Sequence, residues 1–232
     1  MYSFDFSSAF LSGAILFTRS SISLLLIIAV LTWGGFLWIL GIELSWEHVK
    51  PYSLTLAVLT TGWSLFNRYL WRTWPFKLFV RTPDLNGTWK AELQSTYKDP
   101  ASGETRGHIN AFVAIRQTFT SLSVRLLTES GHESFLVASS FDIKEDGTIY
   151  VYGVYQGEPS IADRKAVSAI HYGSFQYKVI GNPATELKGH YWTDRDTGGS
   201  IVLSERRPQW FDSFGSAAAA RIAINESESW LR

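Results

Sequence analysis

The 232-residue sequence contains no cysteine. Disulfide bonds, thiolate catalysis and cysteine zinc sites are therefore excluded, and the composition fits a domain in the cytoplasm. Charge of one sign is not in excess either: 21 Lys and Arg balance 21 Asp and Glu, and residues 81–232 carry 16 basic and 18 acidic side chains. A nucleic acid polymer is bound through many phosphate contacts, so this balance argues against DNA or RNA as the partner. A small anion held by one or two arginines remains compatible with it.

Catalytic motifs are also missing. The sequence has no glycine-rich phosphate loop, no His-Glu-x-x-His and no nucleophile elbow. Of five histidines, only His171 and His190 fall on strands that we expect to be neighbours. A turn centred between Asn182 and Pro183 would pair His171 with Asp194 and leave the two histidines four residues out of register. We expect neither an enzyme nor a cofactor, and polar strand faces are favoured over a metal site.

One long hydrophobic run, Ser21 to Ile42, has 22 residues and no charge. As a helix it would be about 33 Å long, enough to cross a hydrocarbon core of about 30 Å. A buried core helix and a signal peptide are the alternatives, but a signal h-region is shorter and no small-residue cleavage site follows. A second, more polar run reaches from Pro51 to Trp71 if Arg68 extends its charge to the interface. We predict a two-helix transmembrane hairpin over 21–81, with spans near 21–42 and 51–71.

The basic residues around the two runs indicate how the hairpin is oriented. Four follow the second run and one precedes the first, namely Arg68, Arg72, Lys77, Arg81 and Arg19. The connector offers only Lys50 against two glutamates. Basic flanks stay on the cytoplasmic side, so both termini and everything after Arg81 are expected in the cytoplasm.

From Pro83 onward the hydrophobic period changes from 3.6 to 2, so the sequence predicts strands. Hairpin turns with Gly or Asn separate eight of them, near 87–97, 108–119, 122–128, 134–143, 148–155, 167–179, 186–194 and 199–206. We predict an all-β, eight-stranded, up-and-down barrel of lipocalin-like shape over 82–207, closed so that no edge is unpaired. A two-sheet sandwich is the alternative. Residues 1–20 form an interfacial or a frayed segment, and residues 208–232 form a tail with a short helix or disorder.

Two strands begin with a similar pattern, Leu-x-Gly-x-aromatic, at Leu85–Trp89 and Leu187–Tyr191. The parity of these patterns puts Trp89, Tyr191 and Arg195 on one face. Aromatic rings stack on nucleobases, and an arginine fork pairs with phosphate. We therefore name Trp89, Tyr191 and Arg195 as candidate ligand-binding residues. Core filling is the alternative for the two aromatics, and a solvated outer face is the alternative for Arg195.

Two short helical spans, a cytoplasmic β-rich domain and the run Leu187–Arg195 with Gly198-Gly199 together resemble one family. It is the two-transmembrane β-barrel effector family of CBASS, the bacterial cyclic-oligonucleotide antiphage system, and the resemblance covers Ser21 to Arg206. It implies a receptor for a cyclic dinucleotide made by a partner nucleotidyltransferase. It also implies self-association in the bacterial inner membrane and disruption of that lipid bilayer.

A second function remains open. A membrane-tethered, lipocalin-like protein would bind an apolar or amphipathic ligand without harming the membrane. The interior of such a barrel would be lined by aliphatic side chains without arginine. The lining of the barrel therefore separates the two functions.

Overall fold

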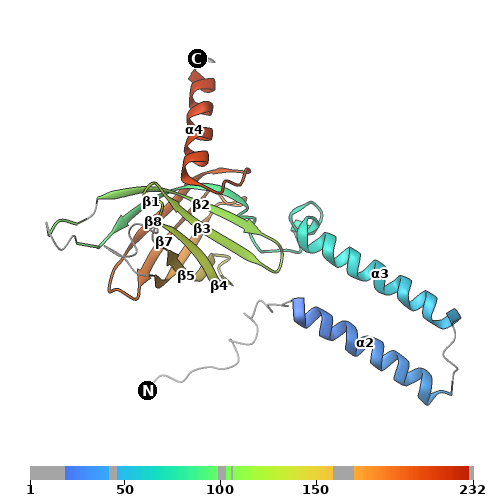
Figure 1. Ribbon diagram of the computed structural model, residues 1–232. Coiled ribbons are helices and arrows are strands. Elements are labelled where there is room, and N and C mark those ends of the chain that lie inside the picture. The colour runs from blue at the N-terminus through green and yellow to red at the C-terminus, as the bar shows by residue number, and fades with distance from the viewer. Residues whose placement is uncertain (1–18, 42–45, 99–102, 106, 159–169, 230–232) are drawn as a thin grey trace. The chain divides into compact units, whose positions relative to one another are not determined.

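The computed structural model describes residues 19–41, 46–98, 103–105, 107–158 and 170–229 (Figure 1). The chain divides into two compact units. One holds residues up to Arg81 together with Thr118–Ser121, and the other holds Thr82–Gln117 and Leu122–Arg232. The division between Arg81 and Thr82 falls where Pro83 ends the helical pattern of the sequence.

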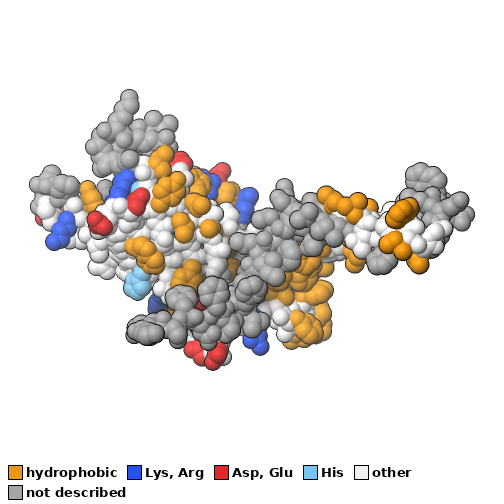
Figure 2. Space-filling view, turned by 90° about the horizontal axis from the view of Figure 1, so that it is seen from below, with side chains coloured by type: hydrophobic (Ala, Val, Ile, Leu, Met, Phe, Trp, Pro, Cys, Tyr) orange, Lys and Arg blue, Asp and Glu red, His pale blue; other side chains and the backbone are white. Residues whose placement is uncertain are grey.

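The first unit contains two long helices, α2 (Arg19–Ile39) and α3 (Trp46–Arg68), followed by the short turns η1 (Leu70–Arg72) and η2 (Phe76–Leu78). Large apolar side chains of the helices are exposed, and Figure 2 shows them in orange. They include Ile27, Leu31, Trp38, Leu54, Val58 and Leu59. Among the described residues, no helix combines the length and the apolar character that crossing a membrane requires. The transmembrane hairpin therefore stays a prediction.

An aromatic cluster lies at the C-terminal end of α3, around the buried ring of Trp71. Its other members are Trp63, Phe66, Phe76 and Phe119. Phe119 comes from the turn Thr118–Ser121, and its N–H donates to the Asn67 carbonyl at 2.9 Å. The Asn67 side-chain oxygen accepts from the Thr120 N–H at 3.0 Å. These bonds explain why this turn groups with the helices.

The second unit is a closed barrel of eight antiparallel strands in sequence order. They are β1 (Gly87–Ser95), β2 (His108–Gln117), β3 (Leu122–Thr128), β4 (Glu133–Ile143), β5 (Ile149–Glu158), β6 (His171–Ile180), β7 (Glu186–Thr193) and β8 (Gly198–Arg207). Because β1 pairs with both β2 and β8, the meander closes on itself. The eight-stranded up-and-down barrel is confirmed and the sandwich is excluded.

The register between β6 and β7 differs from our prediction by one residue. Phe175 pairs with Tyr191 and Gln176 with His190, so the hairpin centres on Pro183. The last pair of this hairpin is Ile180 with Glu186, so its loop is one residue longer than predicted. Within the loop, the N–H of Thr185 donates to the carbonyl of Ile180. The predicted pairing of His171 with Asp194 was therefore wrong.

The end of the barrel where β1 begins is sealed by buried side chains, among them Leu85, Trp89, Leu187 and Leu203. The Trp89 indole donates to the carbonyl of Leu85 at 3.0 Å. Arg206 lies over the Trp89 ring, 5.7 Å from its centroid, and donates to the carbonyls of Asp84 and Asn86, each at 2.7 Å. None of these side chains lines the cavity described below, and we call this end the closed end.

The C-terminal segment continues into α4 (Phe214–Ser229). Trp210, Phe211, Phe214 and Ala217 pack on an outer cluster of Phe112, Ala114 and Leu127 from β2 and β3. The Arg116 guanidinium lies 3.7 Å from the centroid of the Trp210 ring. Of the two alternatives for the tail, a short helix or disorder, the structure has a helix.

The closed barrel has its fewest register pairs at one seam. Strands β3 and β4 share three register pairs, at Arg125–Phe135, Leu126–Ser134 and Leu127–Glu133. Every other neighbouring pair of strands shares six to ten. The barrel is closed as expected, but the later part of β4 has no register partner on β3, which is shorter and begins at Leu122, and a bulge in β4 between Leu136 and Ala138 lies where the shared pairs end.

Candidate functional site

A cavity of about 310 Å³ opens at the other end of the barrel, which we call the mouth. Its lining includes residues of three turns at this end, namely Tyr97, Ser130, His132, Arg195 and Thr197. The deeper wall is aliphatic, with Leu93, Val113, Leu126, Leu136 and Ile201. Ligand sites commonly combine such an apolar wall with a few polar groups.

One wall of the cavity is aromatic, formed by Tyr155 on β5 and by Phe175 and Tyr177 on β6. The rings of Phe175 and Tyr177 are stacked, with centroids 4.2 Å apart and an interplanar angle of 16°. Tyr155 continues the row at 6.5 Å from Phe175. All three residues point inward because side chains of one parity share a face of the sheet. The row presents flat rings to a ligand.

Small residues make room for this row. Gly153 pairs with Phe175, and a Cβ atom on it would lie 2.3 Å from the Phe175 ring. Gly173 pairs with Tyr155, and a Cβ atom on it would meet the Tyr155 ring at the same separation. Each glycine therefore provides the space that the ring opposite occupies.

The tyrosine hydroxyls of this wall stay neutral. Burial raises the pKa of Tyr177 above its ordinary value of 10, and the neighbouring Tyr155 and Tyr191 add to the effect. Burial likewise raises the pKa of Tyr155, and electrostatic interactions with Tyr191 and Asp194 raise it further. Near neutral pH these side chains are uncharged rings whose hydroxyls can both donate and accept. They do not repel an anionic ligand.

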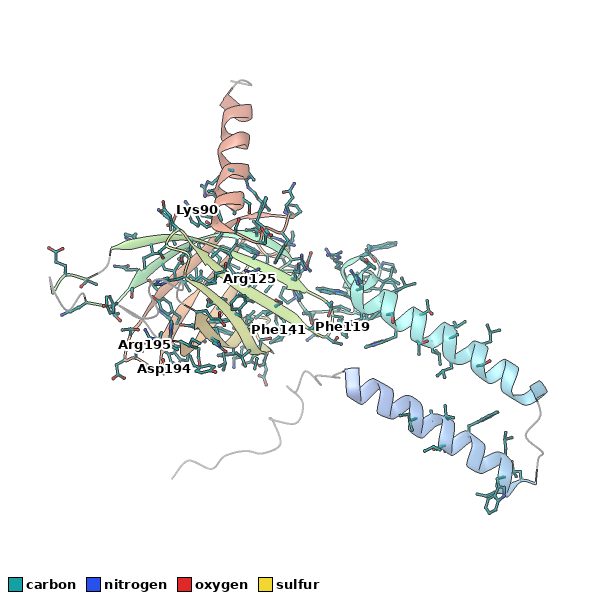
Figure 3. All side chains as sticks on the ribbon, in the orientation of Figure 1. Lys90, Phe119, Arg125, Phe141, Asp194 and Arg195 are labelled. Carbon is teal, nitrogen blue, oxygen red and sulfur yellow. The ribbon has the colours of Figure 1, made fainter. Side chains whose placement is uncertain are left out.

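The turn between β7 and β8 carries Arg195 to the mouth (Figure 3). Thr193 holds this turn through its hydroxyl, which accepts from the Arg195 N–H at 3.2 Å and lies 2.7 Å from the Thr197 hydroxyl. The neighbouring carboxylate of Asp194 accepts from the Tyr172 N–H at 3.1 Å and does not line the cavity. The arginine lines the cavity while the adjacent aspartate is tied to β6.

Among the described residues that line the cavity, Glu133 carries the one carboxylate, and this carboxylate has its own cation. Arg125 Nη2 lies 2.6 Å from Glu133 Oε2, and the two side chains are 24% and 32% exposed. Since the charge of Glu133 is compensated, it opposes an anion in the cavity only weakly. His132 and His171 also line the cavity.

Two of the three residues singled out in the sequence, Tyr191 and Arg195, line the cavity. Trp89 does not, and its ring is 0% exposed at the closed end. Shared parity correctly places Trp89 and Tyr191 inside the barrel, but Trp89 starts its strand at the closed end. The structure therefore places Trp89 away from the cavity, and its stacking on a ligand is not supported by this position. Whether Tyr191 and Arg195 bind a ligand stays a prediction.

Sequence reasoning missed Tyr155, Phe175 and Tyr177 as a set. Their signal was present in the alternation Gly173-x-Phe175-x-Tyr177, where glycine and aromatics share one face with period two. Only the pairing of β5 with β6 brings Tyr155 into the same row.

Comparison with known proteins gives two matches. The family model of the Cap15 cyclic dinucleotide receptor domain matches residues 80–205, which is more than half of the chain. The chain is also similar to CD-NTase-associated protein 15 of Staphylococcus schleiferi, with 26% identity over 190 residues. That alignment covers 82% of this chain and 91% of the relative. The family match begins just before β1 and ends within β8, so it contains the cavity.

Proposed function

The chain belongs to the Cap15 cyclic dinucleotide receptor family of CBASS effectors, and on that premise we propose a function for its cavity and its helices. The barrel binds one cyclic dinucleotide at the mouth. Binding drives further copies of the chain to assemble in the bacterial inner membrane. The assembly then disrupts the bilayer.

The observation that carries this proposal is the cavity, in which an aromatic row and an arginine lie on neighbouring walls. A cyclic dinucleotide has two flat bases and two phosphates. Tyr155, Phe175 and Tyr177 offer ring faces for a base, and base stacking on aromatic rings contributes about 1–3 kcal/mol per base. Arg195 offers a fork for a phosphate, and Tyr191 borders both.

The same lining distinguishes the two functions left open by the sequence. A carrier of apolar ligands calls for an aliphatic interior, and the deep wall of the cavity fits that description. Arg195 at the mouth does not, because the lining of such a carrier is expected to contain no arginine. We therefore favour the nucleotide over the apolar ligand.

The membrane part of the proposal rests on the charge-free run Ser21–Ile42 and on the exposed apolar side chains of α2 and α3. Lipid would cover these side chains at a gain of about 25 cal/mol per Å² of buried apolar surface. Two helices cannot enclose a water-filled path, so damage requires many copies. Basic residues after the second run support a cytoplasmic barrel, where a soluble messenger reaches the mouth.

A binding experiment tests the site. Full-length protein in detergent is titrated with cyclic di-AMP, cyclic di-GMP, cyclic GMP-AMP and cyclic di-UMP by calorimetry. Arg195→Ala removes a charge-assisted hydrogen bond worth about 1.5–3 kcal/mol, so the affinity for the bound nucleotide falls about ten- to hundredfold. Lys178→Ala is the matched control, because it removes an exposed cation on β6 that does not line the cavity. Equal affinities of the two variants would contradict the site.

A second experiment tests the mechanism. Full-length protein is placed in liposomes filled with a self-quenched dye, with and without the nucleotide found by calorimetry. We expect larger crosslinked species and dye release only with the nucleotide, since a ligand shifts assembly only as far as it prefers the assembled state. Leakage without nucleotide, or binding without a change in assembly, would reject the gating scheme.

A further inference from the structure

At the sparsely paired seam between β3 and β4, part of a strand edge has no partner among the described strands. After Phe135 the two strands separate, and the extra residue Val137 in the bulge is 60% exposed. From Ala138 to Ile143, β4 has register partners on β5 and none on β3 among the described strands. An unpaired edge presents a row of N–H and C=O groups that can template pairing with another chain.

The alternation of the ladder identifies the peptide groups on this edge. The Lys144 N–H donates to the Thr148 carbonyl at 2.8 Å, which starts the bonded pairs between β4 and β5. Bonded pairs recur at every second residue of an antiparallel ladder. The peptide groups of Asp142 and Ser140 therefore face β5, and those of Phe141 and Ser139 face the open side.

The composition of β4 leaves this edge unprotected. Natural edge strands carry lysine, proline or inward charges that prevent pairing with other chains. From Ala138 to Phe141 the unpaired segment contains neither a charge nor a proline, and the charge of Asp142 that follows is paired with Lys144 at 2.6 Å. Val137, Ala138 and Ser140 are exposed beside the unpaired groups. Among the described residues, this edge has one charge, which is neutralised by an ion pair, and is therefore suited to pairing.

We propose that this edge of β4 pairs with the same edge of a second copy, as two antiparallel strands about a two-fold axis. In an antiparallel pair of identical segments, the free N–H and C=O groups of each copy bond to those of the other. The two-fold axis makes the contact symmetric: if residue i of one copy faces residue j of the second, residue j of the first faces residue i of the second. The same edge of a second copy has the same spacing of N–H and C=O groups, so a second copy is the partner that fits it. The contact rests on the proposed function, because it names the surface through which the barrels assemble.

The cavity lies against the point where the strands separate. Its lining includes Val124 and Leu126 on β3 and Ser134 and Leu136 on β4, on either side of the last shared pairs. A ligand in the cavity therefore touches both strands where the seam begins. The bound ligand can shift the path of β4 and thereby change how strongly its edge pairs with another strand.

Crosslinking tests the contact, and the absence of native cysteine makes a single thiol informative. Ser140→Cys places an exposed thiol in the middle of the edge of the full-length protein. Ser174→Cys is the matched control on β6, because Ser174 has register partners on both β5 and β7. With a short bis-maleimide and each of the four cyclic dinucleotides, we expect a dimer of Ser140→Cys in severalfold excess over that of Ser174→Cys.

Two changes at the edge should abolish that dimer. Ser139→Pro, added to Ser140→Cys, removes an N–H that faces the open side, where proline is tolerated in an edge strand. Val137→Lys, added separately, places a charge beside the edge, and Val154→Lys on the doubly paired β5 is its control. We expect the crosslinked dimer to be lost with Ser139→Pro and with Val137→Lys, and to be retained with Val154→Lys. Calorimetric binding of the nucleotide, which involves neither Ser139 nor Val137, shows that each variant is folded.

The outcomes separate this proposal from the proposed function. Ligand-dependent assembly by an amine-reactive crosslinker and dye release, without the Ser140→Cys dimer, would overturn the β4 contact and leave the function standing. Absence of any assembly would overturn both. A crosslink of Ser140→Cys to a protein of another mass, in place of the dimer, would also overturn pairing between two copies.

Discussion

The closed end of the barrel depends on Arg206, and its replacement by methionine, which keeps much of the aliphatic bulk, gives a sharp prediction. Arg206 donates to the carbonyls of Asn86 and Asp84, and its Nη2 lies 3.0 Å from the Asp84 carboxylate. Its guanidinium covers the Trp89 ring. Arg206→Met removes all of these contacts and leaves two backbone acceptors without their donor.

The magnitude follows from the geometry. Each hydrogen bond to a charged group contributes about 1.5–3 kcal/mol when desolvated, but the Arg206 and Asp84 side chains are 22% and 24% exposed, so water recovers part of the loss. We expect Arg206→Met to lower the free energy of unfolding by about 2–4 kcal/mol. A domain of this size has a total of about 5–15 kcal/mol, so the loss is a large share.

Urea unfolding of the chain from Thr82 to Arg232, followed by near-ultraviolet circular dichroism, measures this change. The midpoint should fall by about 1–2 M, since the urea slope of small proteins is about 1–3 kcal/mol per M. Lys188→Met is the control, because its ion pair with Glu186 spans 3.1 Å at a side chain that is 54% exposed. Such surface pairs contribute about 0–1 kcal/mol. A loss below about 0.5 kcal/mol in Arg206→Met would refute the role given to the arginine.

The same site predicts a dependence on pH. Burial alone would raise the pKa of Asp84, but hydrogen bonds from Asn86 and the charge of Arg206 outweigh it and lower the pKa below its ordinary value of 3.8. Because the folded state holds the proton less tightly than the unfolded state, this carboxylate stabilises the fold at neutral pH. That stabilisation is lost as pH falls through the lowered pKa. In Arg206→Met the loss below about pH 4 should be smaller.

Three further predictions concern the domain, its orientation and its cavity. The chain from Thr82 to Arg232 should fold without detergent, and its circular dichroism should show a β-rich domain with the helix of α4; a persistently aggregated chain would argue against an independent barrel. In intact cells, a membrane-impermeant thiol reagent should label Ser45→Cys in the connector and spare Ser140→Cys on the barrel; the reverse pattern would overturn the cytoplasmic placement. Gly153→Ala should lower nucleotide affinity about tenfold or more, because the new methyl group displaces the Phe175 ring, whereas Gly215→Ala, with nothing within 4 Å, should leave calorimetric affinity unchanged.

Much of the barrel was determined by local sequence. Period-two hydrophobicity and turn residues predicted all eight strands, and β3 was predicted with the same bounds, 122–128, that the structure has. These features are local, since alternation and turn chemistry act over a few residues. The composition likewise pointed away from a polyanion, and the run Ser21–Ile42 predicted a membrane hairpin that remains to be tested.

Tertiary structure alone decided where inward residues lie along the barrel. Trp89 and Tyr191 have the same pattern and the same parity, yet one seals the closed end and the other lines the cavity. Parity tells inside from outside, whereas position along the axis depends on strand tilt and register around the whole barrel. A one-residue change in a single hairpin, as between β6 and β7, alters which side chains meet. The aromatic row and the open edge of β4 arise from such pairings between strands, so no single stretch of sequence contains them.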